Sequence, residues 1–181
     1  GHYKMNPAGI DMIEDESGNQ LNAKIVPLRS NQPEIPRIGI RCAVPKSFDK
    51  VKWFGRGPHE NYKDRFTSAF TGIYESTPSQ LYTPYIRPQE NGYRTEVNQL
   101  EIGNNSGVKL LVAGQQPISF SALPFSLEQL DYSTSAFKHT CDLIPTQSTW
   151  LHLDLKQMGV GGDDSWGART HEAYLIRPGN Y

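Results

Sequence analysis

The sequence has little of what several classes of protein require. Its unbroken apolar runs, such as Leu110-Leu111-Val112-Ala113, fall far short of the roughly 20 residues that a membrane-spanning helix needs. The 18 lysines and arginines are balanced by 19 aspartates and glutamates, with no basic run that would bind a phosphate backbone. The composition therefore predicts a soluble protein and argues against a membrane or a nucleic acid as partner.

Cysteine is also scarce. The two cysteines, Cys42 and Cys141, permit at most one disulfide, and no cysteine or histidine spacing is typical of a zinc site. The GxSxG motif of serine hydrolases is missing as well. The residues alone thus indicate neither a metal site nor a catalytic nucleophile, and they leave the pairing of the cysteines and the cellular compartment open.

The length of 181 residues is that of a single domain, which we expect to extend over residues 1–181. No internal repeat or linker divides it. The chain begins with Gly1 rather than methionine, and Gly1-His2 fits the remainder of a tag. We therefore expect an excised piece of a longer chain.

Turn-forming residues are abundant, whereas helix signals are few. Thirteen prolines and sixteen glycines interrupt the chain at intervals suited to short strands. In Thr149–Leu155 the leucines alternate with Trp150, His152 and Asp154, which is the period of a half-buried strand. Similar patterns predict strands near residues 21–28, 36–44, 50–54, 69–75, 93–102, 108–113, 117–122, 137–143 and 172–177.

One short helix is predicted at Ser126–Leu130, where Ser126 can cap and two leucines stand three residues apart. About ten short strands with a single helix predict an all-β fold, an antiparallel sandwich.

The segment Met158–Trp166 (MGVGGDDSW) combines three glycines with two carboxylates and a tryptophan. Because glycines free the backbone just before the polar residues, the segment is typical either of a structural turn or of a binding loop. Asp163, Asp164 and Ser165 are candidates for residues that support this loop. The lysine of a P-loop and the terminal glutamate of an EF-hand are both missing.

Trp166 gives this loop its clearest candidate function. A flat indole presents an apolar face to the C–H side of a sugar ring, while neighbouring carboxylates and amides bind sugar hydroxyls. The alternative is a tryptophan that closes one end of the sandwich core. The residues alone leave both interpretations open.

A second cluster, Trp53–Arg65 (WFGRGPHENYKDR), begins as a strand and becomes a glycine-proline turn crowded with polar side chains. His59 and Glu60 are either a proton-transfer pair or turn residues that pair with Arg56 or Arg65. The second interpretation is the more common one for such residues.

A third cluster, Tyr82–Arg94 (YTPYIRPQENGYR), contains two prolines that enforce an extended path. It either lines a groove or forms a stiff connection whose tyrosines pack against the sandwich.

Taken in order, these clusters resemble the C-terminal, small-chain domain of the large bacterial β-galactosidases of glycoside hydrolase family 2. The resemblance extends from about residue 20 to the C-terminus. The matching stretches are Pro36–Gly39, Trp53–Arg65, Tyr82–Gly92 and Met158–Trp166.

The resemblance implies a supersandwich fold, as in galactose mutarotases, placed after a catalytic TIM barrel. Two glutamates of that barrel would carry the retaining hydrolysis of terminal β-D-galactosides such as lactose, so no catalytic residue is expected in this chain. Trp166 would reach the active site and stack on the bound sugar. The Mg²⁺ and Na⁺ of the family are expected in the full enzyme and not in this domain, and the full enzyme is expected to be a homo-oligomer.

The residues alone leave two other functions open. One is a stand-alone, non-catalytic module that binds carbohydrate or mediates assembly, because the chain lacks a nucleophile motif. The other is a mutarotase-like enzyme that would use His59 with Glu60 or Asp164 as general acid and base. The sequence leaves open whether the protein belongs to the cytoplasm or the periplasm of a bacterium.

Overall fold

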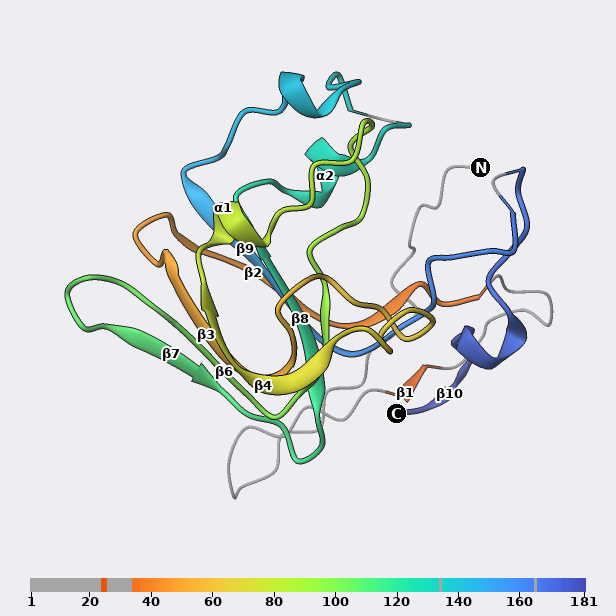
Figure 1. Ribbon diagram of the computed structural model, residues 1–181, viewed down its shortest axis with the longest axis horizontal. Helices are drawn as coiled ribbons and strands as arrows, with labels where there is room; N and C mark the ends of the chain where they lie inside the picture. Colours follow the sequence, from red (N-terminus) through yellow and green to blue (C-terminus); the bar gives the residue numbers. More distant parts are fainter. Residues whose placement is uncertain (1–23, 26–33, 134, 165) are drawn as a thin grey trace.

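The computed structural model describes residues 24–25, 34–133, 135–164 and 166–181 (Figure 1). Two antiparallel four-stranded sheets form most of it. The first sheet has the strand order β2 (Arg37–Pro45), β9 (Ser148–Gln157), β8 (Ile118–Leu123) and β5 (Arg94–Val97). The second has the order β4 (Phe70–Ser76), β3 (Lys50–Gly57), β6 (Gln99–Gly103) and β7 (Lys109–Val112). A separate pair joins β1 (Lys24–Ile25) to β10 (Gly179–Asn180).

The inner faces of the two sheets form one hydrophobic core. In β3 the side chains alternate between buried and exposed, and Trp53 is only 2% exposed. Its ring meets Phe120 of the other sheet edge to face, with 5.6 Å between the ring centroids. Leu100 of β6 and Leu151 of β9 are fully buried in the same cluster. The prediction of an all-β antiparallel sandwich is therefore confirmed.

Within the described residues, two α-helices of four residues each accompany the sheets, where the sequence predicted one. The predicted helix is α2 (Leu127–Leu130), and α1 (Pro78–Leu81) is the additional one. Both begin with a capping box, formed by Ser126 with Gln129 in α2 and by Thr77 with Gln80 in α1. In the described part of the chain, neither helix is long or apolar enough to cross a bilayer.

Two strand predictions were wrong. Within residues 137–143 the chain forms a 3₁₀ turn, η1 (Thr140–Asp142), and within residues 172–177 it forms η2 (Glu172–Tyr174). Asp142 accepts a hydrogen bond from the backbone N–H of His139 at 3.0 Å, which closes the first turn locally. Most side chains of the two segments are exposed, although Leu143 and Ile176 are buried, and neither segment pairs with a strand in the described structure. Strand-forming side chains are therefore not enough to form a strand there.

The strand predicted at residues 93–102 is in fact two strands in different sheets. Glu96 has a left-handed backbone, with φ of 53°, and the chain crosses from β5 to β6 immediately after it. The Glu96 carboxylate pairs with Arg56 at 2.5 Å, which holds this crossover against β3. The strand predicted at residues 21–28 lies mostly outside the described residues.

A buried polar cluster ties β2 to β9. Arg37 donates to Asp154 at 2.9 Å, to His152 Nδ1 at 3.0 Å and to Gln157 at 2.8 Å. Burial raises the pKa of Asp154 to about 6, although the Arg37 charge opposes this. Burial, reinforced by the charges of Arg37 and Arg41, lowers the pKa of His152 to about 4.

The two cysteines are both free thiols. Cys42 is half-buried in β2, where burial raises the pKa of its thiol. Cys141 is exposed in η1. No disulfide therefore staples the sandwich.

Candidate functional site

The segment that follows β9, residues 158–170, is called the Trp166 loop below. It lies at one end of the sandwich, in the dark blue part of the chain (Figure 1). The side chain of Trp166 is 93% exposed, and Val160 is 43% exposed. Trp166 therefore does not close the core, which leaves it free to contact a ligand or another part of the protein.

Asp164 organises the tip of the loop. Its Oδ1 accepts hydrogen bonds from the backbone N–H groups of Trp166 at 2.7 Å and Ala168 at 3.2 Å. Such a side chain-to-backbone turn fixes the backbone on which the indole is mounted. Ser165, the third predicted support residue, lies outside the described residues.

Asp163 faces a different partner. Its two carboxylate oxygens lie 2.7 and 2.9 Å from Nε2 of His171, which follows the loop in sequence. Both side chains are largely exposed, so this contact contributes at most about 1 kcal/mol. The two adjacent aspartates thus point to different partners, and the structure gives both of them contacts within or next to the loop.

The two arms of the loop are joined by Thr170 and by a close backbone approach. The Thr170 hydroxyl lies 2.8 Å from the carbonyl oxygen of Gly159 and 2.9 Å from that of Gly161. A Cβ at Gly162 would lie 2.2 Å from the carbonyl oxygen of Ala168, so only glycine allows the arms to approach this closely. The loop is therefore a closed and internally bonded unit.

Asp64, from the second cluster, anchors the loop to the body of the protein. Its Oδ2 accepts a hydrogen bond from the backbone N–H of Gly161 at 2.7 Å, across 97 positions of sequence. Gly159 packs on the same carboxyl group, because a Cβ at Gly159 would lie 2.7 Å from Asp64 Cγ. Two clusters that are far apart in sequence thus form one site.

The rest of the second cluster makes structural contacts. Glu60 accepts hydrogen bonds from Arg65 at 2.7 Å, from the backbone N–H of Gly92 at 2.7 Å and from the Tyr85 hydroxyl. His59 Nε2 instead lies 3.0 Å from the Ser68 hydroxyl. The two side chains have separate partners, which favours turn residues over a proton-transfer pair, with Arg65 as the partner of Glu60.

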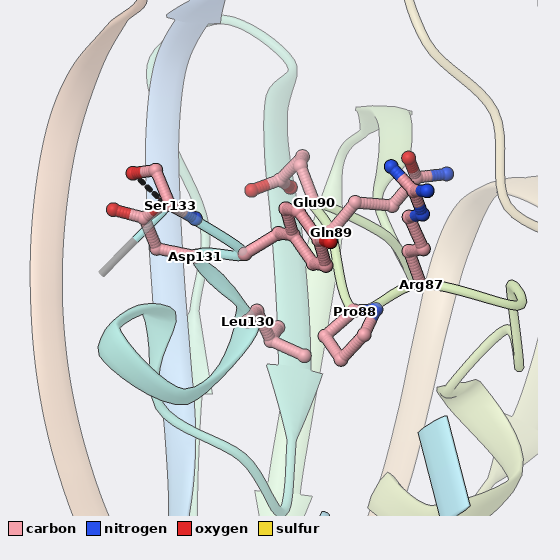
Figure 2. A pocket seen from close by; sticks show the side chains of 8 residues that line it. Arg87, Pro88, Gln89, Glu90, Leu130, Asp131 and Ser133 are labelled. Atoms are coloured by element: carbon pink, nitrogen blue, oxygen red, sulfur yellow. Dashed lines mark hydrogen bonds between the residues drawn. The ribbon is translucent and has the colours of Figure 1, made fainter. Parts of the chain in front are cut away.

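Both roles weighed for the third cluster are found, because Arg87–Glu90 line a groove while Tyr82 and Tyr93 pack against the sandwich. The groove has a volume of about 490 Å³ and lies between Arg87–Glu90 and Leu130–Ser133, the segment that ends α2 (Figure 2). The Arg87 guanidinium lies 4.8 Å from the centre of the Tyr132 ring. Burial raises the pKa of Glu90, and the nearby Arg37 opposes that shift.

Comparison with known protein families shows which family the chain belongs to. Residues 2–181 match the family described as "Beta galactosidase small chain". The chain belongs to this family. A beta-galactosidase of Vibrio cholerae is 41% identical over 162 residues, which is 90% of this chain and 15% of that protein. A beta-galactosidase of Priestia megaterium is 42% identical over 144 residues, or 80% of this chain and 14% of that protein.

A beta-galactosidase of Psychromonas ingrahamii is 35% identical along all of this chain, which covers 17% of that protein. The chain therefore spans about a seventh of the length of the curated relatives that it matches. The resemblance inferred from the sequence motifs is confirmed, and the chain is a β-galactosidase small-chain domain.

Sequence reasoning missed three contributors to the site of this β-galactosidase domain. Thr170 and His171 lie just beyond the MGVGGDDSW motif, and Asp64 stands inside the second cluster without a role assigned to it. The glycines at 159, 161 and 162 signalled a close backbone approach, but they did not indicate what approaches. Only the fold brings Asp64 to them.

Proposed function

We propose that this chain is the C-terminal part of a retaining β-galactosidase that hydrolyses terminal β-D-galactosides such as lactose. Its membership of the small-chain family supports this, as does its match to a small part of much longer β-galactosidases. In the proposal, a TIM-barrel domain of the same protein carries the two glutamates that act as acid/base and nucleophile. The small-chain domain takes no part in bond cleavage.

The contribution of this domain is a stacking face for the sugar. The observation that carries this is Trp166, which is 93% exposed although its backbone is held by Asp164. An indole left in water at the tip of an internally bonded loop retains its apolar face for a partner. The C–H face of a galactoside is a suitable partner because it is flat and apolar, while its hydroxyls can be bound by the barrel.

The described residues do not offer a metal site of their own. Among them, no three histidine, cysteine, aspartate or glutamate side chains come together in a way that would hold a metal ion. In the proposal, the Mg²⁺ and Na⁺ that the family resemblance implies for the full enzyme are bound by other parts of the protein.

The test is to replace Trp166 with alanine in the full-length enzyme and to measure kcat and KM for lactose and for an aryl galactoside. We expect KM to rise about tenfold, because a stacked aromatic face is worth about 1 to 2 kcal/mol. Trp166→Phe should recover part of the loss, since it restores an aromatic face.

The matched control is Phe70→Ala, which removes another exposed aromatic side chain, 72% exposed, at the start of β4. It should leave both kinetic constants unchanged. Unchanged kinetics in Trp166→Ala would contradict the role proposed for Trp166. If the full-length protein binds galactosides without hydrolysing them, and Trp166→Ala abolishes that binding, the non-catalytic binding module is favoured instead.

A further inference from the structure

Asp64 stands on a rigid part of the fold. It lies in a tight turn closed by two backbone hydrogen bonds between Tyr62 and Arg65, of 3.2 and 2.9 Å. Tyr62 is 1% exposed and stacks on Tyr93, with 5.3 Å between the ring centroids. The Arg65 side chain covers the Tyr62 ring and pairs with Glu60. The base that carries Asp64 is therefore fixed by buried aromatic packing.

The Asp64 carboxylate is directed at the Trp166 loop and not at a cation. In the described structure it takes part in no ion pair. Its Oδ2 accepts the Gly161 N–H at 2.7 Å, while its Oδ1 is buried with no hydrogen-bond partner among the described residues. Burying a carboxylate oxygen unpaired costs free energy. Among the described residues, the hydrogen bond from the Gly161 N–H is the interaction that offsets this cost.

A displacement at Gly161 would be passed on to Trp166. Thr170 ties Gly161 to Gly159, so the two glycines that contact Asp64 move together. Gly162 packs against Ala168, and Asp164 joins Ala168 to Trp166. The described contacts thus connect Gly161 to the backbone of Trp166 through Gly162, Ala168 and Asp164.

We propose that Asp64 is the positioning residue of the Trp166 loop, and that its hydrogen bond to Gly161 sets where the indole meets the galactoside. The inference deepens the proposed function and rests on it for its kinetic consequence. Asp64 touches neither the substrate nor the reacting atoms. It acts through Trp166, so the effects of replacing the two residues should not be additive.

The kinetic test uses the full-length enzyme with Asp64→Ala, Trp166→Ala and the double variant. We expect Asp64→Ala to raise KM about fivefold with a smaller change in kcat, because a misplaced indole weakens binding of the sugar. In the Trp166→Ala background the same change should have no further effect on KM, since the residue on which it acts is gone. Additive effects would overturn the proposal.

Two variants separate this role from simple damage to the fold. Asp64→Asn keeps an oxygen that can accept the Gly161 N–H and should restore KM to within about twofold of the original enzyme. Glu75→Ala removes an exposed carboxylate of β4 that pairs with Lys52 of β3, and it should leave KM unchanged. An Asp64→Asn enzyme as impaired as Asp64→Ala would contradict the positioning role.

A readout that does not depend on activity is hydrogen exchange of the peptide covering residues 158–167, measured by mass spectrometry. Asp64→Ala should accelerate its exchange about tenfold or more, while Asp64→Asn and Glu75→Ala should not. Unchanged exchange in Asp64→Ala would overturn the inference even if the enzyme were slower. If instead Trp166→Ala leaves KM unchanged while the exchange responds as expected, the proposed sugar contact fails and the anchoring by Asp64 stands.

Discussion

Gly39 shows how closely a strand can approach its neighbour when one side chain is absent. It pairs with Asp154 in the β2–β9 register, where the register also shifts. A Cβ at this position would lie 2.2 Å from Asp154 Oδ1 and 2.5 Å from the carbonyl oxygen of Leu153. Because the carbonyl oxygen belongs to the backbone, the neighbouring strand would have to move to make room.

We therefore expect Gly39→Ala to lower the free energy of unfolding by about 2 to 3 kcal/mol. Gly107 is the matched control, because its φ of +83° strains an alanine while a Cβ there would meet nothing within 4 Å. Gly107→Ala should cost only about 1 kcal/mol. Urea unfolding followed by circular dichroism measures both, and an equal loss in the two variants would contradict the steric account.

The residues of the Trp166 loop show which features of single residues can be predicted from the sequence and which cannot. The loop itself could be predicted, because three glycines beside two carboxylates are visible as a local pattern. The exposure of Trp166 could not, since the same residues suit a core tryptophan. Asp64 could not be predicted either, because its partner Gly161 is 97 positions away and follows a strand of the other sheet, so only the packing of the two sheets brings them together.

At the scale of elements, α2 depends on its cap. A single helical turn is too short to be stable by itself, so it needs the contacts at its ends. The Ser126 hydroxyl accepts the Gln129 N–H at 3.3 Å, and Gln129 Oε1 accepts the Ser126 N–H at 3.0 Å. Gln129 also donates to the carbonyl oxygen of Ile144 at 2.9 Å, which links the helix to the segment before β9.

Ser126→Ala should therefore destabilise the domain by about 1 kcal/mol through the loss of one cap bond. Exposed Ser106, in the turn before β7, provides the same substitution without a cap. Ser106→Ala should change the free energy of unfolding by less than about 0.5 kcal/mol. Chemical denaturation of both variants decides the matter, and similar midpoints would speak against a stabilising cap.

Strands could be predicted where one face is buried, because burial imposes a period of two. This holds for β3, where exposed and buried side chains alternate along the strand. In β9 the leucines do alternate with polar residues, but His152 and Asp154 on the polar face are buried as well, under Arg37. The rule does not hold for the break between β5 and β6, because a left-handed glutamate at position 96 leaves no mark in the sequence. The strands wrongly predicted near η1 and η2 had suitable side chains, but these segments pair with no strand in the part of the chain that the structure describes.

At the scale of the whole molecule, two buried side chains, Asp154 and His152, make the free energy of unfolding change with pH in opposite directions. The pKa of Asp154 is about 6 in the folded state, above its unfolded value of about 3.9. Its contribution is thus fully present below about pH 4 and is lost as the pH rises through 6. The pKa of His152 is about 4, below its unfolded value of about 6.5, so its contribution is lost as the pH falls through that range.

These two trends offset each other between about pH 4 and pH 6. Replacing His152 with glutamine removes one of them while keeping an acceptor for Arg37. His152→Gln should lower the free energy of unfolding relative to the original chain at pH 7. This difference should shrink by up to about 3 kcal/mol between pH 7 and pH 4. Urea unfolding at a series of pH values measures this, and parallel stability profiles for the two proteins would contradict it.

The two free thiols described above also give the molecule a selective attachment point. Thiol reagents react with the thiolate, so half-buried Cys42, whose pKa is raised, should react slowly and exposed Cys141 quickly. Cys141 follows Thr140, whose hydroxyl bonds to the backbone carbonyl of Tyr85 in the third cluster. A fluorescent dye coupled to Cys141 would consequently report movements of the segment that lines the groove, without any residue having to be changed.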